Sequence, residues 1–286
     1  MDRRNDKMKT EAVMNGDAAE MVNLDRYPIN HLGSAEGIAF ARRCRQEYLD
    51  TGLCMLPGFV LPQAGQLLAD EADELSGDAY FCNNTHNVYL TADNPELPPD
   101  DAARRRQQTL VGSVAFDQIV EHTNLRRLYL WDPLRDFIGA VLDQGEFHRF
   151  ADVFGACSIN VFVDGGQHGW HFDESEYSVT LLLQSPESGG AFEYVPRIRG
   201  LANEKERVAD VLNGERSDVV ELPFTVGALL IFGGRQTIHR VVKVRGSRAR
   251  LTAVMCYSET PGAQNSEAVR KMFWGRAGVE SARVMG

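Results

Sequence analysis

The part of the chain from about residue 150 to 260 is a series of short apolar segments rich in β-branched and aromatic residues. Glycine, proline, aspartate or serine separates each segment from the next, as in ACSINVFVD, EYSVTLLLQ, GAFEYVP, DVVELPF, GALLIFGG, TIHRVVKV and RLTAVMCYSE. Such a series is typical of an antiparallel sandwich or barrel. A charged stretch, residues 197–217, interrupts it and is predicted to be an external helix. This half of the chain is therefore expected to form a jelly roll.

The first half of the chain is predicted to be mainly helical. Apolar residues recur at roughly helical spacing over residues 34–50. Pro62 suits the first turn of a second helix over residues 62–75. A short strand over residues 53–56 is expected between these two helices, and a further helical stretch covers residues 116–142. The fold class is therefore α+β, a double-stranded β-helix (jelly roll) core buttressed by N-terminal helices.

Composition excludes several classes of protein. Acidic residues outnumber basic ones, 40 against 30, for a formal net charge of -10. Nucleic-acid binding needs a basic surface, so a nucleic-acid partner is not expected. No apolar stretch approaches the ~20 residues of a membrane helix, so a membrane partner is not expected either. The five cysteines are odd in number and form no CxxC pair, which favours free thiols and a cytoplasmic location.

The triplet His171-Phe172-Asp173 is the strongest candidate for a metal site. In a strand, side chains two positions apart face the same side, so His171 and Asp173 can converge on one ion. His239, in the β-rich context TIHRVV, is the natural third ligand. Two imidazoles and one carboxylate leave three positions of an octahedral Fe(II) open for a bidentate 2-oxo acid and dioxygen. The expected cofactors are therefore Fe(II), 2-oxoglutarate as cosubstrate, and dioxygen.

Arg250 and Thr252 are the candidate anchor for the distal carboxylate of 2-oxoglutarate. They share one face of the strand RLTAVMCY, and a guanidinium matches a carboxylate by two parallel hydrogen bonds. A buried arginine without an anion is costly, so an arginine in this apolar strand indicates a ligand. Arg248 lies on the same face by the period of two and is the competing anchor. An exposed edge position or a simple ion pair is the bland alternative for Arg250.

The ordered set HxD, a distal histidine and RxT over residues 150–260 resembles the Fe(II)/2-oxoglutarate-dependent oxygenase superfamily. The stretch HGWHFDESEYSVTLLLQSPESGGAFEYVPRIR and the tail VRKMFWGR are similar to the free-amino-acid halogenases and hydroxylases typified by the lysine halogenase. In halogenating members a glycine stands where this chain has Asp173, so the resemblance implies hydroxylation. It also implies that His168, Glu174 and Trp274 line a substrate pocket.

Each of these three substrate residues has a structural alternative. His168 is either a substrate contact or an exposed loop residue. Glu174 either binds an ammonium group or faces water. Trp274 either closes the pocket or packs its helix against the barrel. The resemblance and Glu174 together favour a free polar or cationic amino acid as the small-molecule substrate, and a homodimer is compatible with the sequence.

Three rival functions remain open on the sequence. The first is a radical halogenase of the same group, which Asp173 disfavours. The second is a metal-binding jelly roll without oxygenase activity, which would have no use for Arg250 and Thr252. The third is an oxygenase acting on a peptide. The sequence also predicts the domain organisation. A flexible tail (1–24) precedes a single oxygenase domain (25–286). Within that domain, residues 25–149 form the helical support and include a lid loop at 92–108, residues 150–260 form the jelly-roll core, and residues 261–286 form a C-terminal helix that closes the pocket.

Overall fold

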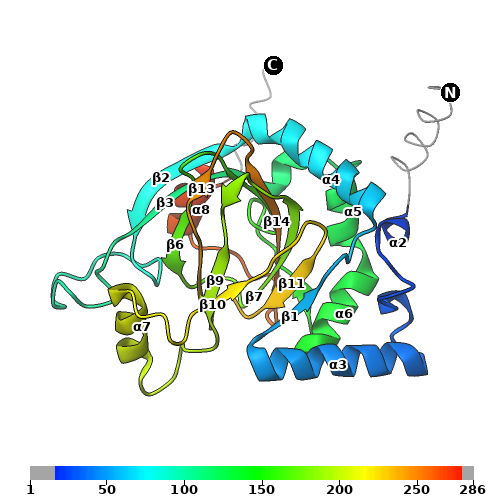
Figure 1. Cartoon of the computed structure of the whole chain (residues 1–286), viewed down its shortest axis with the longest axis horizontal. Helices are drawn as coiled ribbons and strands as arrows, with labels where there is room; N and C mark the ends of the chain where they lie inside the picture. The colour runs from blue at the N-terminus through cyan, green and yellow to red at the C-terminus, as the bar shows by residue number, and fades with distance from the viewer. Residues whose placement is uncertain (1–16, 279–286) are drawn as a thin grey trace.

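The computed structural model describes residues 17–278, and its core consists of two antiparallel sheets that face each other (Figure 1). The larger sheet has the order β1-β11-β7-β14-β5-β3-β2, with β4 paired to β14; the smaller has the order β10-β9-β12-β6. A further pair joins β13 and β8. The strands are β1 (Leu53–Leu56), β2 (Tyr80–His86), β3 (Gln107–Val114), β4 (His148–Arg149), β5 (Cys157–Phe162), β6 (His168–His171), β7 (Tyr177–Gln184), β8 (Ser188–Gly189), β9 (Phe192–Val195), β10 (Val220–Leu222), β11 (Leu229–Phe232), β12 (Ile238–Val241), β13 (Val244–Arg245) and β14 (Arg250–Ser258).

The helices α3 and α4 form where the sequence predicts them, and capping residues set the ends of α3. The α-helices of the predicted stretch 116–142 begin only at Asn124, and α2 lies within the segment predicted to be a flexible tail. The Oγ of Ser34 accepts the amide of Gly37 at the start of α3, and Gly52, with φ 83°, ends that helix. Pro62 occupies the first turn of α4. The α-helices are α2 (Ala18–Met21), α3 (Ala35–Thr51), α4 (Pro62–Leu75), α5 (Asn124–Leu130), α6 (Asp132–Leu142), α7 (Glu204–Asn213) and α8 (Glu267–Trp274).

Helices α3 to α6 gather on one side of the larger sheet, and α7 lies at the opposite end of the molecule (Figure 1). Phe40, Leu68 and Phe137 of these helices belong to the same buried cluster as Leu181 of β7 and Ala253 of β14. Because side chains alternate along a strand, the odd-numbered residues of β7 and β14 face the helices and the even-numbered ones face the space between the sheets. This alternation decides which residues of the larger sheet are available to a site.

The fold class predicted from the sequence is confirmed, with one correction in its first half. That half is not purely helical, because β2 and β3 pair antiparallel over their length and β3 joins β5 at the edge of the larger sheet. Their polar residues gave no clear apolar alternation, since β2 is an edge strand with most of its side chains exposed. Pairing with a neighbour, and not local preference, makes this segment a strand.

The predicted tail and lid also need correction. Residues 1–16 of the tail lie outside the described residues, but residues 17–24 belong to the fold. Met21 and Val22 are 3% and 2% exposed, and Val22 forms a β-bridge with Val60. The irregular loop ends at residue 106, where β3 begins. Arg105 of that loop donates to the carbonyl of Leu212 at the end of α7, so the loop is docked beside α7.

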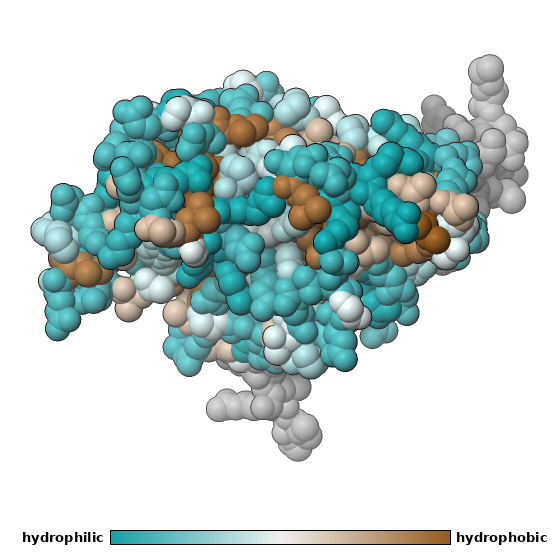
Figure 2. Space-filling model, turned by 90° about the horizontal axis from the view of Figure 1, so that it is seen from below, coloured by the Kyte–Doolittle hydropathy of each residue, from teal (hydrophilic) through white to brown (hydrophobic). Residues whose placement is uncertain are grey.

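The surface is mainly hydrophilic where Figure 2 shows it, and hydrophobic residues gather there only in small groups. Scattered apolar side chains of this kind are normal for a protein surface exposed to water. Between residues 17 and 278, no helix combines the length and the apolar character needed to cross a bilayer.

Glu193 of β9 holds the outer face of the smaller sheet together and provides a first prediction. Its carboxylate, 3% exposed, accepts two hydrogen bonds from Arg216 (2.6 and 2.8 Å) and one from Arg240 of β12 (2.6 Å). Glu193→Ala is expected to lower the free energy of unfolding by about 2–3 kcal/mol, because two arginines lose a buried partner but can partly rehydrate. Urea unfolding measures this loss. The exposed Glu215→Ala is the control, with an expected change within about 0.5 kcal/mol; equal losses in both would contradict the prediction.

Candidate metal centre and pockets

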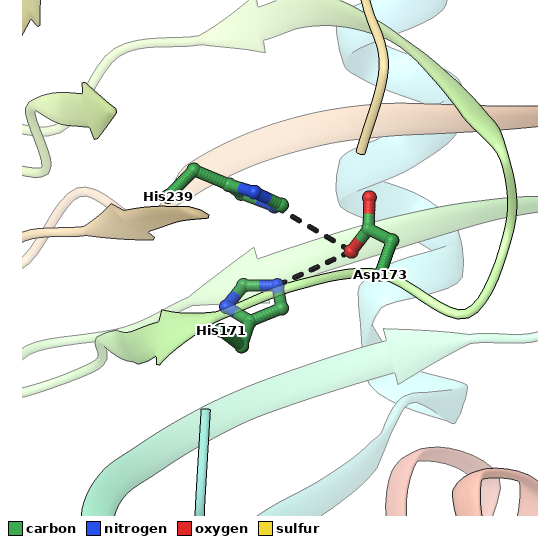
Figure 3. Close-up of side chains that lie close together, drawn as sticks. All are labelled: His171, Asp173 and His239. Atoms are coloured by element: carbon green, nitrogen blue, oxygen red, sulfur yellow. Dashed lines mark ion pairs between the residues drawn. The ribbon is translucent and has the colours of Figure 1, made fainter. Parts of the chain in front are cut away.

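His171 and His239 lie side by side because their strands pair in register. His171 ends β6, His239 lies on β12, and the two residues are direct antiparallel partners. Their ring centroids are 4.2 Å apart, and both side chains are buried. Figure 3 shows both rings pointing toward the carboxylate of Asp173, which follows the end of β6. The pairing of β6 with β12 therefore brings together residues 68 positions apart in the chain.

Asp173 is held in place by two hydrogen bonds of its own. Its amide donates to the carbonyl of Gly234 (3.1 Å), and its Oδ2 accepts from the hydroxyl of Ser178 (2.5 Å). A Cβ at position 234 would collide with the carboxylate, so only glycine allows this approach. Oδ1 remains turned toward the histidines, 3.3 Å from Nε2 of His171 and 3.5 Å from Nε2 of His239.

The orientation of the three side chains suits a metal ion. Nδ1 of His171 donates to the carbonyl of Gly169 (2.8 Å), and Nδ1 of His239 donates to that of Thr237 (2.9 Å), so both Nε2 lone pairs face Asp173. Burial and the neighbouring His239 lower the pKa of His171. Burial opposes ionisation of Asp173, but the neighbouring His239 and His171 hold the pKa of its carboxyl well below the usual value. Neutral imidazoles and an ionised carboxylate are the forms that bind metal.

The geometry of the donor atoms fits a divalent transition metal. One ligand atom from each of His171, Asp173 and His239 lies within 4.8 Å of the others. Two nitrogens and one oxygen on one side of an ion form the arrangement of non-haem Fe(II) oxygenases, with the remaining positions open. The residues present therefore fit the Fe(II) that the sequence predicts.

A pocket of about 80 Å³ extends from the histidines to Arg250. Arg250 is 3% exposed, its guanidinium lies 5.5 Å from the ring of Phe162, and it donates to the hydroxyl of Thr252. Burial lowers the pKa of Arg250 to about 10. Arg248, the competing anchor, is exposed instead. A buried guanidinium without a carboxylate beside it matches an incoming carboxylate ligand.

A second pocket, of about 90 Å³, lies on the other side of the metal-binding residues. His168, Glu174 and Trp274 all line it, as the resemblance implied. The ring of His168 stacks on that of His171 with centroids 3.6 Å apart, so His168 is not an exposed loop residue. Nε2 of His168 and Nε1 of Trp274 are buried without a hydrogen-bond partner. Both atoms are therefore available to a bound molecule.

The loop at 92–106 does not border this second pocket. The lining of this pocket includes residues of α8 and also Leu90. Leu90 lies at the base of the loop and has a left-handed φ of 56°. Helix α8, and not the loop, thus contributes to the lining of this pocket. Residues 279–286 of the C-terminal segment lie outside the described residues.

Several residues of the two pockets have no sequence signal of their own. Ser178 and Thr180 of β7 are hydroxyl residues in an apolar strand, and Asn160 of β5 borders both pockets. The buried hydroxyl of Thr180 lacks a partner and shares a pocket with Arg250. The sequence feature that could have indicated these residues is a polar side chain at an inward-facing position of an otherwise apolar strand. The pairing of β7 with β14 brings Thr180 into the same pocket as Arg250 and Thr252.

His86 supplies a second prediction, on stability against pH. Its Nδ1 donates to the carbonyl of Asn87 (2.9 Å) and its Nε2 accepts from the hydroxyl of Thr109 (2.7 Å), so the buried ring is neutral. Burial, with the neighbouring His171, lowers the pKa of His86 to about 4, against about 6.5 in the unfolded chain. The unfolded chain binds the proton first, so stability is complete above about pH 6.5 and falls as the pH drops toward 4.

The expected loss from His86 is about 2 kcal/mol in the free energy of unfolding between pH 7 and pH 5. Urea unfolding of the metal-free protein and of His86→Gln at both pH values measures it, because only the difference between the two proteins belongs to His86. His122→Gln, at an exposed position, is the matched control. Equal pH dependence in the His86 variant and the parent protein would refute the prediction.

Comparison with solved structures identifies the fold as that of the 2-oxoglutarate- and Fe(II)-dependent oxygenases. The chain is similar to an oxidoreductase of the 2OG-Fe(II) oxygenase family from Burkholderia pseudomallei, with 18% identity over 78% of this chain and 92% of that one, and a TM-score of 0.50. It is also similar to the non-heme alpha ketoglutarate dependent epimerase SnoN from nogalamycin biosynthesis, with 14% identity, 77% and 83% coverage, and a TM-score of 0.55. HygX from Streptomyces hygroscopicus, solved with nickel, 2-oxoglutarate and hygromycin B bound, matches at 15% identity, 77% and 88% coverage, and a TM-score of 0.51.

The family of the chain is narrower than this fold. The model of the family described as Halogenase D matches residues 38–273, so the chain belongs to that family. A search of curated proteins returned no match. The match spans most of the helical half, both sheets and nearly all of α8, and therefore includes the three metal-binding residues and every lining residue of the two pockets except Trp274.

Proposed function

We propose that the protein is an Fe(II)- and 2-oxoglutarate-dependent dioxygenase that hydroxylates an unactivated C–H bond of a small molecule. The observation that carries the proposal is a group of two buried histidines and one half-buried carboxylate at the junction of two pockets, which share His171 and Asp173 in their lining. One pocket ends at Arg250, a buried cation without a carboxylate partner. The other has a mainly apolar surface, although several serine, asparagine and histidine side chains also line it. One pocket thus suits an anionic cosubstrate and the other a substrate.

Each residue has a definite task in this proposal. His171, Asp173 and His239 hold the iron, and Ser178 keeps the ligand oxygen of Asp173 turned toward it. When bound, iron and 2-oxoglutarate supply the oxidation of a C–H bond by dioxygen, with release of succinate and carbon dioxide. Arg250 binds the distal carboxylate of 2-oxoglutarate through its planar fork, and the hydroxyls of Thr252 and Thr180 complete that end of the pocket.

Asp173 favours hydroxylation over halogenation. Membership of the Halogenase D family makes a halogenase the second candidate, because a halide needs a coordination position on the metal. Here the carboxylate of Asp173 points at that position and is fixed there by Ser178 and Gly234. The protein therefore offers a third ligand where a halogenase would leave room for chloride.

We further propose a free amino acid as substrate. Support comes from family membership and from the sequence stretches around His168 and Trp274, which resemble the amino-acid halogenases and hydroxylases. His168 and Trp274 contact the substrate through their unpartnered nitrogens. The resemblance and Glu174, whose carboxylate lines the pocket, favour a polar or cationic amino acid. A homodimer and a cytoplasmic location stay predictions of the sequence.

The test of the proposed function is succinate formation coupled to substrate oxidation. Protein reconstituted anaerobically with Fe(II) and 2-oxoglutarate is exposed to air with each of the common amino acids, in buffer with and without chloride. Succinate together with the mass gain of one oxygen atom on an amino acid is the expected result. A chlorinated product would establish the halogenase instead. Absence of succinate with every substrate would leave a metal-binding jelly roll and refute the oxygenase.

A further inference from the structure

We infer that the loop before β5, residues 152–155, positions helix α8 at the substrate pocket. In this arrangement Asp152 is a positioning residue, and Gly155 determines which substrates fit. The inference rests on the proposed function, because it concerns the pocket that the proposal gives to the substrate. It adds two residues that belong neither to the metal-binding group nor to the lining of the cosubstrate pocket.

The carboxylate of Asp152 joins this loop to α8, and its side chain is completely buried. Oδ1 accepts from the amides of Phe154 and Gly155, both at 2.9 Å. Oδ2 accepts from the amide of Asn265 and from Nε of Arg270, both at 2.8 Å. Burial raises the pKa of this carboxyl, but the four hydrogen bonds outweigh burial and lower the pKa below its usual value. The ionised carboxylate therefore links two segments that are 113 positions apart in the chain.

Arg270 receives this link on the side of the helix. Its Nη2 donates to Oε1 of Gln264 (2.5 Å), before α8, and its Nη1 donates to the carbonyl of Ala277 (3.3 Å), after α8. Helix α8 has only eight residues, and a helix of that length is marginal by itself, so its orientation depends on such contacts. Glu174 holds Ser266, the N-cap of α8, by two further hydrogen bonds of 2.7 Å. Loss of the Asp152 link should therefore loosen the helix without releasing it.

Both linked segments contribute to the lining of the substrate pocket. The residues that they contribute are Gly155, Asn265, Val269, Phe273 and Trp274. The metal-binding residues, in contrast, are fixed by the pairing of β6 with β12 and by the hydrogen bonds of Asp173 to Ser178 and Gly234. A shift of α8 against the loop thus changes the wall of the pocket and leaves the metal-binding group in place.

Gly155 allows two side chains of the α8 segment to approach the loop closely. A Cβ at position 155 would lie 2.4 Å from Nδ2 of Asn265 and 2.7 Å from Cη2 of Trp274, closer than side chains can pack. The φ of Gly155 lies outside the left-handed region, so the requirement is for space and not for backbone conformation. Nε1 of Trp274 is buried without a hydrogen-bond partner, so the position of this ring decides where a substrate meets that donor. A side chain at position 155 would displace Asn265 and Trp274 and reduce the space for the substrate.

The role of Gly155 is tested with Gly155→Ala, reconstituted with Fe(II) and 2-oxoglutarate and assayed with each of the common amino acids. We expect KM for the best amino acid to rise about 10-fold and the ratio of succinate to oxidised product to rise with it, because the substrate is held less well against the metal. Among the amino acids that are oxidised, the rise should be smallest for the smallest. KM for 2-oxoglutarate and the affinity for Fe(II) should stay within about twofold.

Gly145→Ala is the matched control, since Gly145 is exposed and a Cβ there meets no atom within 4 Å. An active parent protein whose KM and product ratio do not change in Gly155→Ala would overturn the inference alone. An equal rise in KM for 2-oxoglutarate would overturn it too, because the defect would then reach both pockets. Absence of succinate from the parent protein would refute the proposed function, and the inference would fall with it.

The positioning role of Asp152 is tested by variants at both ends of its ion pair. Asp152→Asn and Arg270→Ala are each expected to raise KM for the substrate about 10-fold and to raise the ratio of succinate to product. The double variant should add little, because both changes break one contact. In the metal-free protein, hydrogen exchange of the amides of residues 269–274 should become at least about 10-fold faster, which reports the loosening of α8 independently of turnover.

Lys271→Ala, which removes an exposed cation of the same helix, is the control for charge and should behave as the parent protein. Faster exchange of the α8 amides with unchanged KM and product ratio would reduce Asp152 to a stabilising residue and overturn its positioning role. Unchanged exchange in folded Asp152→Asn and Arg270→Ala proteins would show that the link does not hold the helix.

Discussion

Replacing His239 with alanine is expected to abolish turnover and to weaken Fe(II) binding by more than about 100-fold. Loss of a residue that merely orients a metal ligand typically costs 10- to 100-fold in affinity, so loss of a ligand costs more. His171 and Asp173 would remain, but one nitrogen and one carboxylate hold an exchangeable divalent ion weakly. His171→Ala should give the same result, because the two rings are register partners and equivalent neighbours of Asp173. Anaerobic titration with Fe(II), and with Co(II) as a spectroscopic substitute, measures the affinity.

The control for this prediction is His122→Ala, since His122 is exposed and far from the pairing of β6 with β12. It should retain metal binding and turnover. Circular dichroism and thermal unfolding of the metal-free variants separate loss of a ligand from loss of the fold. Unimpaired iron binding in a folded His239→Ala protein would show that the three residues are not the metal site.

Replacing Arg250 with alanine is expected to raise KM for 2-oxoglutarate by on the order of 100-fold, with a much smaller change in KM for the substrate. Removing one partner of a buried, hydrogen-bonded charge pair costs about 2–5 kcal/mol, and every 1.4 kcal/mol is tenfold. Arg250→Lys should be intermediate, because lysine keeps the charge but lacks the planar fork that matches a carboxylate. Succinate formation at varied concentrations of 2-oxoglutarate measures the effect.

A matched control distinguishes the two arginines of this segment. Arg248→Ala changes an exposed side chain two residues earlier and should leave KM for 2-oxoglutarate within about twofold. Thermal unfolding gives a second reading: 2-oxoglutarate with Co(II) should stabilise the parent protein and the Arg248 variant but not Arg250→Ala. The reverse pattern would place the cosubstrate anchor at Arg248.

Glu174 illustrates how a residue can lie where the sequence places it and still have a different partner. It lines the substrate pocket, as the resemblance implied, but both carboxylate oxygens bind the N-cap of α8. The order of residues along the chain contains no information on this contact, because Glu174 and Ser266 are 92 positions apart.

What the sequence determines by itself is local. Strand alternation places His171 and Asp173 on one side and Arg250 with Thr252 on one face, and capping residues such as Ser34 set helix ends, because these properties depend on residues a few positions apart. The tertiary structure alone decides what depends on strand order. Pairing of β6 with β12 brings His239 to the metal site. Arg250 is buried because β14 begins at this residue, whereas Arg248 lies in the exposed bend before the strand. The docking of α8 gives Glu174 its partner. Each of these contacts joins segments that are distant in the chain, so its cause is the packing of whole elements and not a preference of the residues themselves.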